Sequence, residues 1–81
     1  MALYAQHLLR RGRPAAALPH LEQFAARESD SPEACYWLGQ GLLALGRARP
    51  AREAFAAGLR AAGPRTDPHL IQQLRHAERR R

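Results

Sequence analysis

The sequence repeats itself with a period of 34 residues. When the chain is shifted against itself by that distance, identical residues coincide at several positions around one glycine. A period of this size is typical of folds in which a small helical unit is stacked on a copy of itself. The sequence therefore predicts one helical unit that is written twice. The identical pairs are Gln6 with Gln40, Leu8 with Leu42, Leu9 with Leu43, Gly12 with Gly46, Arg13 with Arg47 and Ala17 with Ala51.

Glycine and proline divide the chain into five segments, and each segment has the pattern of one helix. Glycine just past a helix end accepts a left-handed conformation, and proline just inside the next helix loses only an N–H that has no partner there. Each break therefore predicts a stop followed by a start. The expected helices cover residues 2–11, 14–27, 32–45, 48–62 and 67–79.

The residue types exclude a sheet. Alanine, leucine, arginine, glutamine and glutamate dominate, and all of them are favourable in helices. Valine is absent, and Ile71 and Thr66 are the only β-branched residues, so strands have almost no material. A chain of 81 residues forms one domain, here residues 1–81, and the predicted class is all-α.

Residues 32–65 resemble the tetratricopeptide repeat family, whose unit pairs two helices through a glycine turn. The resemblance implies a solenoid of helical hairpins with five antiparallel helices: repeat one at 1–31, repeat two at 32–65 and a capping helix at 67–79. Repeat one fits less closely, because Phe24 stands where the family has a small residue and Tyr4-Ala5 replaces the Leu-Gly pair. The residues that match in repeat two are Leu38, Gly39, Leu42, Gly46, Ala51, Phe55, Gly58 and Pro64.

The resemblance also implies a function, which is to bind a peptide or protein segment as an adaptor or scaffold. Members of the family bind such segments in a concave groove lined by the first helix of each repeat. Tyr36 and Trp37 are the most informative candidates, because amphipathic aromatics are enriched at binding hot spots. For Trp37 the alternative is packing against a neighbouring helix. Carried over by position, the peptide-binding residues are Gln6, Leu9, Arg10, Tyr36, Trp37, Gln40 and Leu43, with Glu33 and Ala44 beside them.

One subfamily, the binders of chaperone tails, holds a terminal carboxylate with lysine, asparagine and arginine side chains. This sequence has neither lysine nor asparagine, and Ala2, Gln6 and Trp37 stand at three of the clamp positions. Tight binding of an acidic Glu-Glu-Val-Asp tail is therefore not expected.

A nucleic-acid-binding protein is the alternative function. All thirteen basic side chains are arginines, and the formal net charge is +6. A basic chain of this size is compatible with phosphate binding. The arginines are scattered along the sequence, however, so no basic face is predicted and nucleic acid is the less favoured partner. Those in helices and turns include Arg10, Arg11, Arg27, Arg47, Arg52, Arg60 and Arg75, and a run follows at 79–81.

Catalysis and metal binding have no sequence support. Cys35 is the only cysteine and lacks any nucleophile signature around it, and the four histidines have no ligand spacing. The expectation is a protein that is not an enzyme and needs no cofactor.

Two repeats are fewer than the three that usually make a stable array. We therefore expect self-association through the open N-terminal end, or a place within a longer array. No stretch approaches the ~20 apolar residues that span a bilayer, so the expected location is cytoplasmic with no membrane partner.

Overall fold

A computed structural model describes residues 3–28 and 30–79, and in this part of the chain it contains five helices and no strand. The all-α prediction is confirmed. Four predicted helices are one residue too long, because Arg11 lies in a turn, Leu45 and Ala62 are C-caps, and Asp67 precedes the last helix; Ala2 lies outside the described residues. The helices are α1 (Leu3–Arg10), α2 (Pro14–Arg27), α3 (Pro32–Ala44), α4 (Ala48–Ala61) and α5 (Pro68–Arg79).

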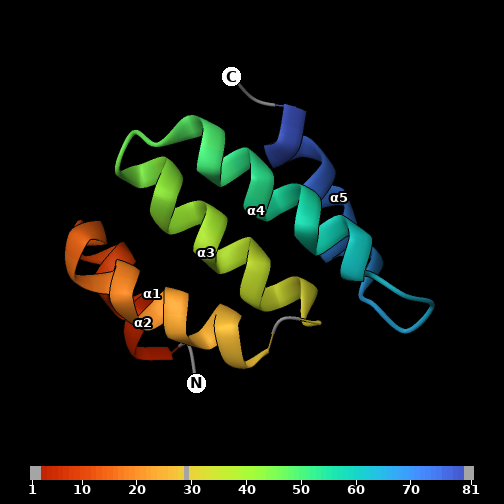
Figure 1. The fold of residues 1–81 in the computed structure, drawn as a ribbon, viewed down its shortest axis with the longest axis horizontal. Helices are drawn as coiled ribbons and strands as arrows, with labels where there is room; N and C mark the ends of the chain where they lie inside the picture. The colour runs from red at the N-terminus through yellow and green to blue at the C-terminus, as the bar shows by residue number, and fades with distance from the viewer. Residues whose placement is uncertain (1–2, 29, 80–81) are drawn as a thin grey trace.

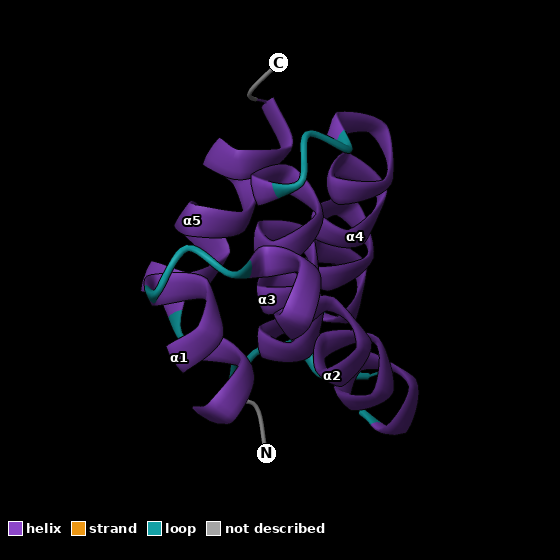
Figure 2. Ribbon diagram, turned by 90° about the vertical axis from the view of Figure 1, so that its left-hand side faces the viewer, coloured by secondary structure: helices purple, strands orange, loops and turns teal. Residues whose placement is uncertain are grey.

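The helices form a stack in which each packs against the next along the chain (Figure 1). Short turns join them, so neighbours run antiparallel and α1, α3 and α5 run in the same direction. Figure 2 shows α1 and α5 on one side of α3, and α2 and α4 on the other. One face of α3 is therefore flanked by the two odd-numbered helices.

The two glycine turns have the same geometry. Gly12 and Gly46 adopt φ values of +74° and +79°, which side chains with a Cβ rarely adopt. In the first turn the Gly12 N–H donates to the Leu9 carbonyl at 3.0 Å and the Arg13 N–H donates to the Leu8 carbonyl at 2.9 Å. The Gly46 turn repeats both bonds 34 residues later. These bonds satisfy carbonyls that a helix end leaves free, and they terminate α1 and α3.

Side chains cap the helices that begin at the other end of the stack. The Ser31 hydroxyl accepts the Ala34 N–H at 3.3 Å at the start of α3. The Asp67 carboxylate accepts the His69 N–H at 3.0 Å at the start of α5. Each bond satisfies an N–H that the helix itself cannot.

The core consists of two clusters that Leu38 joins, because this side chain packs against both. Glycines let neighbouring helices of the stack approach one another closely. A Cβ on Gly58 would lie 3.0 Å from Leu74 and 3.1 Å from Cys35. One cluster holds Ala5, Leu8, Ala17 and Leu21 of α1 and α2, and the other holds Leu42, Ala51, Ala54, Phe55, Leu74 and Ala77 of α3, α4 and α5.

Candidate functional site

A hollow of about 290 Å³ lies between α1 and α3. Leu9, Trp37 and Ala44 supply its apolar lining, and Arg10 is its only charged lining residue among those described. Because α1 and α3 run parallel, residues near the C-terminal ends of both helices meet here. The full lining is Gln6, Leu9, Arg10, Trp37, Gln40 and Ala44. The structure thus brings five of the seven predicted peptide-binding residues together, with Ala44.

A second hollow, of about 190 Å³, lies between α3 and α5. It carries two carboxylates, from Glu33 and Asp67, on the side where α3 and α5 begin. Sequence reasoning assigned α5 only a capping role and missed its contribution. The signal was available, since α5 occupies the place of the first helix of a following repeat. The lining residues are Glu33, Tyr36, Trp37, Asp67, His69, Leu70 and Gln73.

Trp37 lines both hollows, so the two form one groove across α3, which we call the concave groove. The indole is half-buried and packs against the α1–α2 core cluster. Its ring centroid lies 5.4 Å from that of Tyr36 in an edge-to-face arrangement. Packing against neighbouring helices and lining the groove are therefore both properties of this one side chain.

The remaining predicted residues divide between the groove and the core. Tyr36 lines the α3–α5 hollow and also approaches Phe55, with ring centroids 6.1 Å apart. Leu43 packs against the core cluster around Phe55 and lines neither hollow. The cluster that it contacts belongs to α3, α4 and α5.

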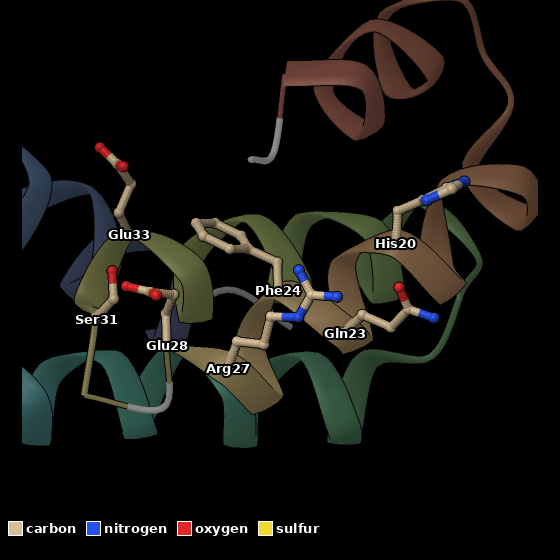
Figure 3. Close-up of a pocket in the computed structure, with 7 residues that line it drawn as sticks. All are labelled: His20, Gln23, Phe24, Arg27, Glu28, Ser31 and Glu33. Carbon is tan, nitrogen blue, oxygen red and sulfur yellow. The ribbon is translucent and has the colours of Figure 1, made fainter.

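A further hollow, of about 540 Å³, lies beside α2 and the turn into α3 and meets the α3–α5 hollow at Glu33 (Figure 3). Phe24, which departs from the family pattern, is half-buried here and is surrounded by polar side chains. Figure 3 shows the Phe24 ring between Glu33 and His20. The residues that line it are His20, Gln23, Phe24, Arg27, Glu28, Ser31 and Glu33.

The fold gathers charges that the sequence separates. The α1–α2 and α3–α4 turns lie at one end of the stack, and the α2–α3 and α4–α5 turns lie at the other (Figure 1). Arginines that are separated in the sequence therefore belong to the two turns at the same end. They are Arg10, Arg11, Arg13, Arg47 and Arg49, and all are exposed.

The Cys35 thiol and the possible metal ligands bear on the chemistry of the described residues. Cys35 is buried, and desolvation raises the pKa of its thiol, while the positive charge of Arg60 opposes that rise to a smaller extent. A neutral, buried thiol is a poor nucleophile and a poor metal ligand. Residues 3–28 and 30–79 contain no group of three side chains that could hold a metal ion. Within the same residues, every helix is too short or too polar to cross a membrane.

Comparison with known proteins identifies a family for this chain. No curated protein and no solved structure matches the chain. The sequence model of a family described as "Tetratricopeptide repeat" matches residues 8–75, which include both glycine turns and most of α5. The match confirms the resemblance that Leu38, Gly39 and Phe55 indicated, and the chain belongs to the tetratricopeptide repeat family.

Proposed function

We propose that this chain holds a segment of a partner protein in the concave groove, with Trp37 as the central anchor. Tetratricopeptide repeats are generally protein–protein interaction modules. The observation that carries the proposal is the shared position of Trp37, which lines both hollows while the core fixes its other side. A side chain held in this way loses little conformational freedom when a ligand covers it, and this favours binding.

The size of the hollows favours a chain-like ligand over a small molecule. Pockets for small molecules usually enclose about 300 Å³ or more. The two hollows of the groove measure about 290 and 190 Å³ and are open to solvent over adjacent surfaces of α3. Each is suited to one side chain of a longer segment, and Trp37 separates the two positions.

Trp37 also reports on the groove, because it is the only tryptophan of the chain. A library of random linear peptides without tryptophan is displayed and selected on the purified chain, and selected peptides are then titrated while Trp37 emission is recorded. Binding in the groove is expected to shift the emission to shorter wavelength in a saturable manner, because the indole loses contact with water. Selected peptides that bind without changing the emission would contradict the proposal.

Two variants separate loss of binding from loss of folding. Ala44→Tyr fills the α1–α3 hollow from an exposed position and removes no core contact, so it is expected to abolish the emission shift. Ala26→Tyr places the same side chain at an exposed position of α2, outside the groove, and is expected to leave binding unchanged. Equal effects of the two substitutions would argue against the groove.

The sequence contains neither lysine nor asparagine, and this bears on the binding of peptides that end in Glu-Glu-Val-Asp. Of the three clamp positions, Gln6 and Trp37 lie in the α1–α3 hollow, and Ala2 lies outside the described residues. We expect no binding of a Glu-Glu-Val-Asp tail peptide in calorimetry at micromolar concentrations. Binding at that strength would show that another set of residues replaces the clamp.

Self-association is a second proposal, which rests on the α1 side of the stack. Among the described residues, Tyr4 is the large apolar side chain that stays exposed, with 59% of its surface accessible. The outer surface of α5 is polar by contrast, because Gln72, Arg75 and His76 are exposed there. Light scattering of the purified chain is expected to show a dimer or larger species that Tyr4→Glu dissociates. A monomer at all concentrations would contradict it.

A further inference from the structure

Five exposed arginines lie at the end of the stack that carries the glycine turns. Residues 10–13 and 45–49 contain these arginines and no acidic residue. We call this surface the basic end. At the opposite end, the α2–α3 and α4–α5 turns and the first turn of α3 carry most of the acidic side chains of the chain, together with Arg27 and Arg65. The acidic residues are Glu28, Asp30, Glu33 and Asp67.

Helix electrostatics explains only part of this arrangement. Arg10 in the last turn of α1 is favourable, because cations stabilise the negative end of a helix dipole. Arg13 and Arg47, however, are the N-caps of α2 and α4, and Arg49 lies in the first turn of α4. A cation is unfavourable at these positions, and neither first turn contains an acidic residue to offset it. The charge of the basic end is therefore not a by-product of helix stability.

The basic end is continuous with the concave groove. Arg10 belongs to the basic end and also lines the α1–α3 hollow, beside Leu9, Trp37 and Ala44. A ligand that places an apolar group in this hollow therefore lies next to arginine side chains. On the far side of Trp37, the α3–α5 hollow carries Glu33 and Asp67 instead.

We propose that the partner is an acidic protein segment with an apolar anchor: the anchor enters the α1–α3 hollow, and the acidic residues on one side of it contact the basic end. This inference rests on the proposed function and adds the chemistry and direction of the ligand. Charge complementarity carries it, because arginine is well suited to bidentate pairing with carboxylates. Carboxylates on one side of the anchor supply the contact. A Glu-Glu-Val-Asp tail is disfavoured because it carries carboxylates on both sides of its valine, and one side would face Glu33 and Asp67.

An apolar hollow beside the arginines favours protein over nucleic acid. Non-specific nucleic-acid binding combines basic grooves with aromatic faces on which bases stack. Beside Arg11 and Arg13 the aromatic side chain is Tyr4, whose ring is already engaged edge-to-face with His20. Beside Arg10 it is Trp37, which is half-buried against the core, and its other neighbours in the hollow are aliphatic or amide side chains. Such a lining accepts an apolar side chain of a peptide.

Matched charge reversals test the location of the contact. The variant Arg10→Glu with Arg13→Glu reverses two charges of the basic end, and the control Arg27→Glu with Arg65→Glu reverses two at the opposite end. Arg10 and Arg27 both lie in the last turn of a helix, and Arg13 and Arg65 both lie in turns. Both pairs replace two arginines with two glutamates, so they change the net charge equally. Circular dichroism melts establish that both variants fold.

The same random peptide library supplies the probe. Peptides selected on the unaltered chain are expected to carry acidic residues on one side of an apolar residue in a fixed order. The basic-end variant is expected to bind these peptides about tenfold or more weakly. Hydrogen bonds to charged groups contribute more free energy of binding than neutral ones. The control variant is expected to bind them unchanged. Added salt is expected to reduce affinity for the unaltered chain.

Each other outcome separates the inference from the proposed function. Peptides that shift Trp37 emission but show no acidic bias, or that lose equal affinity in both variants, overturn the inference and leave groove binding in place. Selected peptides that never alter Trp37 emission overturn both. Fluorescent single- and double-stranded oligonucleotides are titrated in parallel. Binding of these that the basic-end variant alone abolishes, without acidic peptides in the selection, would overturn the inference in favour of nucleic acid.

Discussion

The aromatic ring of Phe55 occupies the space that a side chain at position 39 would need. A Cβ built on Gly39 would lie 2.7 Å from Cδ1 and Cζ of that ring, and Phe55 is only 1% exposed, so the ring has no free space to move into. Gly39→Ala is expected to lower the free energy of unfolding by about 2 kcal/mol, because overpacking outweighs the gain in helix propensity. Urea denaturation measures the effect.

The direct contact between Gly39 and the Phe55 ring leads to a second prediction. Phe55→Leu shortens the ring side chain, so it is expected to cost less in the Gly39→Ala background than in the unaltered chain. Additive costs in the double-mutant cycle would show that the two positions do not contact each other as described.

Gly12 and Gly46 need their glycines for a different reason. Neither has any atom within 4 Å of a built Cβ, but both have positive φ. Alanine at either position is expected to cost about 1 kcal/mol through backbone strain alone. Gly63→Ala is the matched control, since Gly63 also has open space and lacks the positive φ, and it is expected to be neutral. Chemical denaturation of all three variants that ranked Gly63→Ala lowest in stability would contradict this account.

The N-cap side chains of α3 and α5 are expected to contribute similar amounts to the free energy of unfolding. Ser31→Ala and Asp67→Ala each remove one acceptor for a helix N–H, from Ala34 and His69 respectively. Each is expected to cost about 1 kcal/mol, measured by thermal or urea unfolding, whereas Asp67→Asn retains an acceptor and costs less. Hydrogen exchange that stayed unchanged at the Ala34 N–H in Ser31→Ala would show that the cap is dispensable.

Burial of Cys35 predicts a dependence of stability on alkaline pH. The folded chain raises the pKa of this thiol, chiefly by desolvation, so the unfolded chain ionises at lower pH than the folded one. The thiol therefore does not reduce stability below its ordinary pKa of about 8.5, and stability falls as pH rises from there through the folded pKa. Unfolding free energies compared with those of Cys35→Ala isolate the effect. Parallel pH profiles for the two chains would contradict it.

Much of this structure could be predicted from the sequence because its signals are local or periodic. The turns at Gly12 and Gly46 could be predicted from residue type alone. The hollow between α1 and α3 could be predicted because helix positions repeat with the 34-residue unit, which places Gln6, Leu9, Arg10 and Gln40 together. Family membership and the all-α fold followed from the same pattern.

The rest depends on three-dimensional contacts that periodicity does not encode. Gly41 lies against Leu21 of another helix, where a Cβ would come within 2.6 Å of that side chain, yet nothing local distinguishes it from a neutral residue. Leu43 shares the groove spacing and also packs against the core cluster around Phe55. The basic end arises because alternate turns of an antiparallel stack lie side by side, which the order of residues along the chain conceals.

Trp37 emission during titration with a selected peptide is the most direct measurement of whether the groove binds a partner segment. The account predicts a saturable shift to shorter wavelength that Ala44→Tyr removes and Ala26→Tyr preserves. Saturable binding, detected by calorimetry, with unchanged Trp37 emission would place the partner elsewhere on the molecule and contradict the account.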